Sequence, residues 1–96
     1  MATDIVRGYR VLGGGMDEQE RIISRPRAGD VIRYDAEAAK APPVGELIKI
    51  SIRPREWRGA PLRFTPQPSL FGGWEVHGVE PIEGKPTHVT VSLRAL

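Results

Sequence analysis

The residues best suited to chemistry lie in one short stretch, between positions 52 and 64. Four arginines, one tryptophan and one phenylalanine occur there. Arginine pairs with carboxylates and phosphates and stacks on aromatic rings, and arginine and tryptophan are enriched where proteins contact one another. Phosphate contacts combined with base stacking also hold single-stranded nucleic acid. The stretch therefore predicts a surface that grips a macromolecule, and its candidate residues are Arg53, Arg55, Trp57, Arg58, Arg63 and Phe64.

The two histidines of the chain raise the question of a metal site. His77 and His88 fall on the outward faces of two predicted strands, and Glu75 lies close to His77 in the sequence. Two histidines and one carboxylate are the ligands of a facial metal triad. Polar side chains on the outer faces of strands are ordinarily solvated, however. We therefore predict no metal site and no cofactor.

Other patterns that carry catalysis are incomplete. A dinucleotide-binding fingerprint that begins at Gly13 needs glycine at position 18, where the chain has Glu18, and the Gly-Lys-Ser/Thr ending of a phosphate-binding loop is absent from the sequence. None of the serines lies in the context of a nucleophile elbow. No pair of carboxylates has a recognisable acid–base setting. The expectation is a protein that is not an enzyme.

The first fifteen residues predict an extended arm on a glycine hinge. Residues 3–12 are rich in β-branched and aromatic residues, but neither face of the segment is consistently apolar. Mixed faces are typical of an edge strand or of an arm that lies on a neighbouring molecule. Gly13-Gly14-Gly15 then interrupts the segment. The arm residues expected to contact a partner are Ile5, Val6, Tyr9 and Val11.

Residues 16–96 predict one small domain built mainly from strands. The strands are expected at residues 31–34, 46–53, 62–65, 74–80 and 87–93. Alternation is clearest in the last of them, where Val89, Val91 and Leu93 share one face. The last two strands predict an antiparallel hairpin across residues 81–86. On strict alternation, Val79 would share the outward face of His77.

Helical segments are expected to be few and short. Asp17 and Glu20 have the spacing of a capping box and predict one or two helical turns over residues 17–23, with a loop as the alternative. Asp35 and the helix formers after it predict a short helix over residues 35–41. Residues 54–73 carry four prolines and predict a long ordered loop.

These elements indicate an all-β chain, or a β-rich chain with one or two helical turns. The expected architecture is a small antiparallel barrel or sandwich of five to six strands with long loops. The 96 residues suffice for one domain, and the absence of cysteine leaves no disulfide to stabilise it. The sequence has no signal-peptide pattern and no apolar run of membrane-spanning length. We expect a soluble protein that is cytoplasmic or assembled into a particle.

The leading hypothesis is a structural or adaptor subunit that acts through protein–protein contact or self-assembly. A decoration or connector component of a virion would be one such subunit. The arm would add a strand to a neighbour, and the loop would supply the anchor. The alternative is a small β-barrel that binds nucleic acid through residues 53–64. The net charge of +2 is too small to imply nucleic acid by itself.

Overall fold

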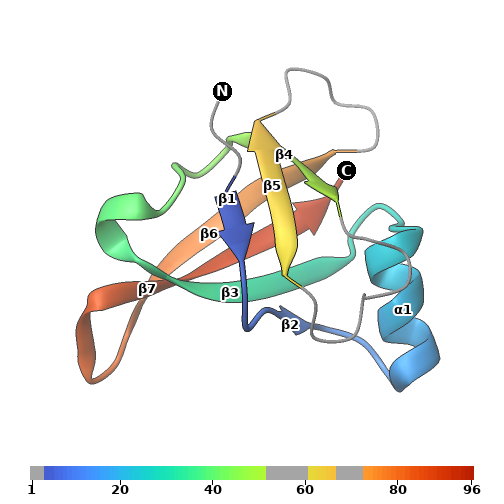
Figure 1. Ribbon diagram of the computed structural model, residues 1–96, viewed down its shortest axis with the longest axis horizontal. Coiled ribbons are helices and arrows are strands. Elements are labelled where there is room, and N and C mark those ends of the chain that lie inside the picture. Colours follow the sequence, from blue (N-terminus) through green and yellow to red (C-terminus); the bar gives the residue numbers. More distant parts are fainter. Residues whose placement is uncertain (1–3, 52–60, 67–72) are drawn as a thin grey trace.

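Seven strands form one antiparallel sheet in the computed structural model of the chain, and one α-helix lies at the end of that sheet (Figure 1). The structure describes residues 4–51, 61–66 and 73–96. The elements in chain order are β1 (Asp4–Val6), β2 (Arg10–Val11), α1 (Met16–Ser24), β3 (Val31–Glu37), the 3-10 helix η1 (Ala38–Lys40), β4 (Leu47–Ser51), β5 (Leu62–Pro66), β6 (Trp74–Ile82) and β7 (Lys85–Ala95). The β-rich class predicted from the sequence is confirmed.

The long hairpin of β6 and β7 is the element that the sequence predicts most directly. The two strands pair antiparallel from Trp74 and Ala95 to Ile82 and Lys85, so both are longer than predicted. Only two residues connect them, and Gly84 adopts a φ of +79°. A left-handed conformation in a two-residue turn matches the twist of the flanking strands. The predicted hairpin is therefore confirmed.

A bulge in β6 changes which side chains face the core. Val76 pairs with Leu93 but Gly78 pairs with Ser92, so His77 is one extra residue on its strand. A bulge of this kind reverses the alternation that follows it. Val79 consequently packs against the hydrophobic core. Its expected place on the outward face was wrong, because strict alternation takes no account of an inserted residue.

β3 replaces most of the helix expected over residues 35–41. The strand continues through Asp35, Ala36 and Glu37, which pair with residues 88–90 of β7, and only the short η1 follows. Ala36 is half-buried and packs against the core. Local helix propensity amounts to tenths of a kcal/mol per residue, so pairing with β7 overrides it. The helix prediction was wrong for this reason.

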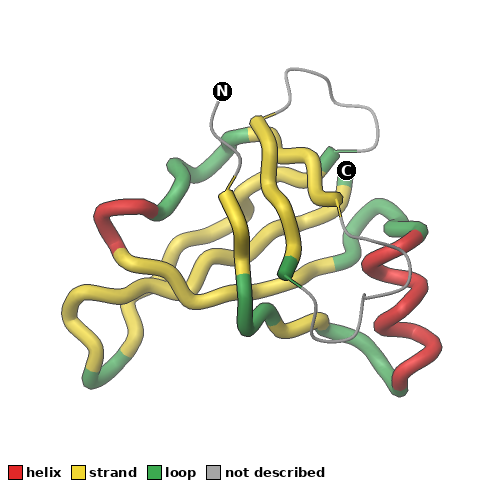
Figure 2. The backbone as a smooth tube through the Cα atoms, in the orientation of Figure 1, coloured by secondary structure: helices red, strands yellow, loops and turns green. Residues whose placement is uncertain are grey.

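The two ends of the sheet belong to consecutive strands of the chain. The strand order is β1-β5-β4-β6-β7-β3-β2, so β1 and β2 lie at opposite ends. Only three residues separate them, and a chain of that length spans roughly 14 Å at most. The sheet must therefore curl until its ends approach each other, as the adjacent tubes in Figure 2 show. It is not closed by strand pairing between the ends, so neither the barrel nor the sandwich is confirmed.

Gly8 explains why neither face of residues 3–12 is consistently apolar. Val6 faces inward and is buried, whereas after Gly8 the residues that pack against the core are Tyr9 and Val11. The inward set thus switches from even to odd positions. Gly8 adopts a φ of +68°, in the left-handed region that glycine favours. The mixed pattern therefore reflects a bend between two regular strands.

The helix α1 covers one end of the curled sheet. It is the helical alternative predicted over residues 17–23, and its Ile22 and Ile23 belong to the hydrophobic core. Gly13 lies directly beneath it, because a Cβ atom there would come within 2.8 Å of Ile22 Cδ1. Any larger residue at position 13 would displace the Ile22 side chain and strain a backbone with a φ of +156°. None of the helices in the described part of the chain is long and apolar enough to cross a membrane.

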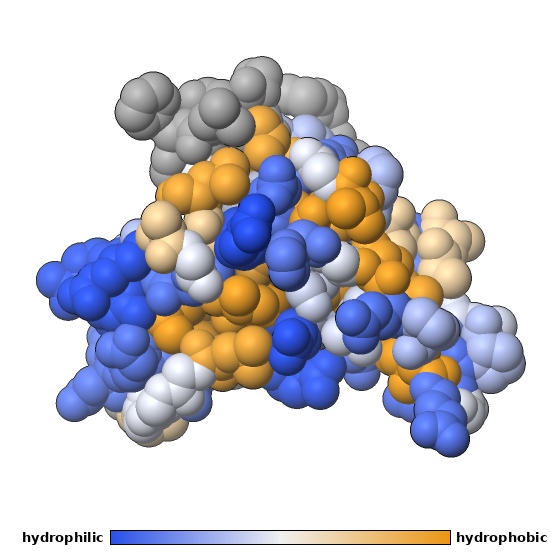
Figure 3. Space-filling view, turned by 180° about the vertical axis from the view of Figure 1, so that it is seen from behind, coloured by the Kyte–Doolittle hydropathy of each residue, from blue (hydrophilic) through white to orange (hydrophobic). Residues whose placement is uncertain are grey.

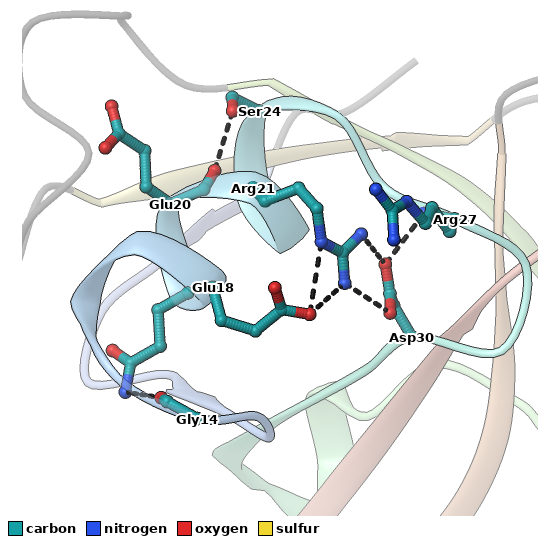
Figure 4. A network of polar contacts seen from close by, with 8 residues as sticks. Gly14, Glu18, Glu20, Arg21, Ser24, Arg27 and Asp30 are labelled. Carbon is teal, nitrogen blue, oxygen red and sulfur yellow. Dashed lines mark hydrogen bonds and ion pairs between the residues drawn. The ribbon is translucent and has the colours of Figure 1, made fainter.

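Arg21 ties α1 to the turn that precedes β3 (Figure 4). Its guanidinium donates to both carboxylate oxygens of Asp30, at 2.9 and 3.1 Å, and to Glu18 at 3.1 Å. The Arg27 amide donates to the same Asp30 carboxylate at 2.7 Å. Two-pronged pairing of arginine with a carboxylate fixes orientation as well as distance. The network therefore sets the position of α1 relative to the sheet.

Candidate functional site

The predicted binding residues divide into those inside and those outside the described part of the chain. Arg53, Arg55, Trp57 and Arg58 lie outside the described residues. Arg63 and Phe64 belong to β5, and the four arm residues lie in or beside β1 and β2. The structure therefore places six of the ten predicted residues.

Pairing of β1 with β5 brings the arm and the end of the loop segment together. Ile5 lies directly opposite Arg63, and Arg63 in turn lies opposite Ser51 of β4. Residues that pair across neighbouring strands share one face of the sheet. The outer face of β1, β5 and β4, called here the outer edge face, consists of Ile5, Arg63, Thr65, Lys49 and Ser51. Two predicted residues from distant parts of the sequence are thus neighbours.

The outer edge face is basic and carries an exposed aliphatic side chain. Ile5 is 58% exposed. Neither Arg63 nor Lys49 has an ion-pair partner among the residues that the structure describes. An arginine beside an exposed isoleucine offers apolar contact and a planar set of donors together. This combination suits contact with another macromolecule.

The remaining predicted residues on these strands stabilise the protein's own core. Val6 and Phe64 are both buried. The Phe64 ring meets Tyr34 edge to face, with centroids 5.1 Å apart and an interplanar angle of 71°. Tyr9 and Val11 are half-buried and pack against the same core. Ile5 and Arg63 are therefore the predicted residues whose side chains remain accessible.

A second feature, which sequence reasoning missed, is a gap between β1 and β3. Along residues 34–37, β3 pairs with β7 on one side, while β2 pairs only with Arg33 and Ile32 on the other. A cavity of about 390 Å³ fills the gap and is called here the β1–β3 slot. It is lined by Asp4, Ile5, Val6, Arg7, Tyr34, Asp35, Ala36, Glu37 and Lys40. The one sequence signal that bears on it is Gly8, at the bend between β1 and β2.

Tyr34 lies where the slot meets a smaller neighbouring cavity. That cavity, of about 40 Å³, shares Asp4 and Tyr34 with the slot and also contacts Glu46. Burial, together with the nearby negative charges of Asp4 and Glu46, raises the pKa of Tyr34 to about 12. Like charges near a group that would become negative disfavour its ionisation. Asp4 and Glu46 therefore place negative charge beside Tyr34, at the junction of the two cavities.

The histidines do not form the triad considered from the sequence. His88 pairs with Glu37 of β3, whereas His77 is the bulge residue, and the β6–β7 register places them at different levels of the hairpin. The Glu75 carboxylate accepts a hydrogen bond from Arg94 at 3.0 Å. In the parts of the chain that the structure describes, no group of three or more potential ligands could hold a metal ion.

The opposite face of the molecule is a mosaic. Figure 3 shows apolar areas there separated by charged side chains. One ion pair of the described residues, between Arg94 and Glu75, belongs to the hairpin of β6 and β7. The outer edge face and the adjoining slot are therefore the candidate functional site. No protein-family model, no curated protein and no solved structure matches the chain.

Proposed function

We propose that this protein is a non-enzymatic structural or adaptor subunit that acts through protein–protein contact. The observation that carries the proposal is the pairing of Ile5 with Arg63, which joins an exposed aliphatic side chain and an arginine that has no ion-pair partner among the described residues. Interfaces are enriched in arginine, and their binding energy comes from apolar side chains that become buried beside it. A role as a virion decoration or connector component is one specific form of this proposal.

A second candidate function is nucleic-acid binding through the same face. Arg63 and Lys49 are diagonal neighbours on paired strands, and neither is neutralised by a carboxylate among the described residues. Two adjacent cations are suited to phosphate contacts. Protein contact ranks first because Ile5 adds apolar surface, which phosphates do not need.

The test compares the effect of substitutions in the outer edge face on association with the effect of a charge reversal in the β6–β7 turn. The variants are Ile5→Lys and Arg63→Glu, with Lys85→Glu in the β6–β7 turn as the control. Light scattering after size exclusion, over a range of protein concentrations, measures self-association. A photo-crosslinking residue at position 5 or 85, introduced in the protein's native cells, measures contact with other proteins.

Protein contact predicts association or crosslinks at position 5 that both face variants reduce, and that change little when the salt concentration rises. Crosslinks of equal yield at positions 5 and 85 would contradict the proposal. A chain that stays monomeric and binds a labelled oligonucleotide, with affinity that falls steeply with salt and is lost in Arg63→Glu, would establish the second candidate instead. Deletion of residues 1–15 is not a suitable variant, because it removes β1 and β2.

A further inference from the structure

Backbone groups of β3 face the β1–β3 slot, where no strand in the described part of the chain pairs with them. Amides and carbonyls of consecutive residues in a strand point to opposite sides, so those of every second residue share one side. The Val31 carbonyl accepts a hydrogen bond from Leu12, which follows β2, at 3.2 Å. The β3–β7 register continues without a shift to Glu37. The backbone groups of Asp35 and Glu37 therefore point to the same side as those of Val31, where β2 no longer pairs with them.

The edge of β1 across the slot also directs backbone hydrogen-bonding groups toward the slot. The Glu46 carbonyl accepts a hydrogen bond from Val76 of β6 at 2.9 Å, so alternation directs the Ser51 backbone toward β5. Arg63, opposite Ser51, then points toward β4, and Ile5, opposite Arg63, points away from β5. The slot thus lies between two strand edges whose backbone groups face each other.

The N-terminal segment bends away from β3 at Gly8, so it does not pair with residues 34–37 of that strand. β2 pairs with Arg33 and Ile32, and straight continuation of that strand toward its N-terminus would pair it with residues 34–37. The positive φ at Gly8 instead diverts the chain to β5. An extended segment in the slot would therefore lie where a straight continuation of β2 would pair with β3.

The direction of such a segment follows from the topology. Five antiparallel pairings connect β1 to β3 through the sheet, so these two strands run in opposite directions. One strand between them must be antiparallel to one and parallel to the other. The free edge of β3 is longer than β1, and antiparallel pairing is slightly more stable per residue. The favoured segment runs antiparallel to β3.

Charge indicates which side chain the segment would carry on its inner face. The carboxylates on the outer rim are already paired, Asp35 with Arg10 and Glu37 with Lys40. Asp4 and Glu46 have no ion-pair partner among the described residues, and both act on the Tyr34 hydroxyl. Arg7 also lines the slot, but Asp4 and Glu46 lie where the slot meets the smaller cavity, and a cationic side chain directed there would pair with them.

We propose that the β1–β3 slot binds an extended segment of a partner protein as an additional strand, with a lysine or arginine directed toward Asp4 and Glu46. This inference rests on the proposed function and specifies its partner. Strand addition supplies affinity through backbone hydrogen bonds and specificity through alternate side chains. A second copy is the less suitable occupant, because its own free edges face each other across the same slot and β2 is only two residues long.

The test uses the peptide acetyl-Thr-Val-Thr-Lys-Thr-Val-Thr-amide as the probe and the full chain as the receptor. Amide hydrogen exchange by NMR is measured with and without the peptide. Binding in the slot slows exchange at Asp35, Glu37 and Ile5. The Tyr34 and Ala36 amides point toward β7, so their exchange serves as the internal control.

Two controls separate the backbone and charge contributions. A peptide that is N-methylated at the alternate residues whose amides would face β3 loses its donors to that strand and should bind much more weakly. Replacement of the peptide lysine by glutamate, or the double variant Asp4→Asn/Glu46→Gln in the protein, should each weaken binding about tenfold. The protein variant is matched by Glu80→Gln on β6, which should leave the affinity unchanged.

Three outcomes would overturn the inference: no protection at Asp35 and Glu37 at millimolar peptide, equal affinity for the lysine and glutamate peptides, or protection that appears without peptide as the protein concentration rises. The last outcome would identify a second copy as the occupant. Failure here does not decide the proposed function, because the effect of Arg63→Glu on association tests the outer edge face at a residue that does not line the slot. Loss of both results would remove the proposed function as well.

Discussion

At the scale of single residues, Tyr34 connects the core to the candidate site. Its ring packs edge to face on Phe64, while its hydroxyl lies near the negative charges of Asp4 and Glu46. Ionisation would place a negative charge on a buried side chain near these two carboxylates. The Tyr34 ring therefore stabilises the sheet, and the pKa of its hydroxyl responds to the charges of Asp4 and Glu46.

This arrangement predicts a loss of stability at alkaline pH. The pKa of Tyr34 is about 12 in the folded protein and near 10 in the unfolded chain, so the folded state holds the proton more tightly. Stability is complete below pH 10 and decreases as pH rises toward 12, by on the order of 2–3 kcal/mol. Urea unfolding of the wild type and of Tyr34→Phe over this range measures the effect. Equal pH dependence of the two proteins would contradict it.

The Arg21 network predicts the opposite behaviour in acid. Hydrogen bonds from Arg21 lower the pKa of Asp30 and of Glu18 below the usual carboxyl values. A folded-state pKa below that of the unfolded chain means that the stabilisation is present above about pH 4 and is lost as pH falls through the folded-state values. Asp30→Asn should reduce this acid sensitivity, whereas Glu20→Gln on the exposed part of α1 should not. Urea midpoints between pH 2 and pH 6 test it.

Some residue-level predictions follow from the sequence and others cannot. Exposure of Ile5 and Arg63 agrees with the roles assigned to them, but their adjacency depends on pairing between strands that are almost sixty positions apart. Burial of Val6 and Phe64 was not predictable from alternation alone. The bend at Gly8 reverses which positions face inward, and a conformational switch at one glycine is not marked by the periodicity around it.

At the scale of elements, α1 is a short helix that depends on tertiary contacts. A helix of nine residues is marginal by itself in water. Ile22 and Ile23 anchor it in the core, and Arg21 holds it to the turn before β3. The sequence left helix and loop as alternatives here because neither contact is local.

Substitutions beneath and within α1 should show how much it contributes. Ile22→Ala deletes a fully buried side chain and should lower the free energy of unfolding by about 2–5 kcal/mol. Gly13→Ala should also be destabilising, because its Cβ would approach Ile22 Cδ1 to 2.8 Å at a φ of +156°. The control is Gly14→Ala, where no atom lies within 4 Å of the added Cβ. Chemical denaturation compares them, and equal stability of the two glycine variants would argue against the close approach.

Strands were easier to predict from the sequence than helices for a physical reason. In β7, Val91, Leu93 and Ala95 are buried on one face as alternation predicts, although Ser92 between them is buried too. Residues 35–41 contain good helix formers, but Asp35, Ala36 and Glu37 complete the ladder with β7. Propensity describes the isolated segment, whereas the ladder exists only after residues 85–95 are in place.

At the scale of the whole molecule, the N-terminal segment holds the two ends of the sheet together. β1 pairs with β5 at one end and β2 with β3 at the other. The sequence indicates an edge strand or an arm in this segment, and the observed pairing shows it within the protein's own sheet. Strand order could not be predicted, because it requires contacts between residues far apart in the chain.

Deletion of residues 1–8, which removes β1, should therefore destabilise the whole fold. Removal of β1 takes Val6 from the core and exposes Leu62 and Phe64, with which β1 pairs. Burial of each such side chain is worth about 1.5–3 kcal/mol. We expect the truncated chain to lose a cooperative thermal transition, measured by circular dichroism. Ile5→Ser, which alters only an exposed side chain of β1, should retain that transition.

The same connection determines when the protein can finish folding as it leaves the ribosome. β1 emerges early, but its partner β5 lies more than fifty residues later, and β7, which pairs with both β6 and β3, comes last. Until β5 has been synthesised, β1 has no strand to pair with. The nascent chain thus carries an unpaired, aggregation-prone strand while more than fifty further residues are added, and slow pairing of distant strands prolongs that exposure.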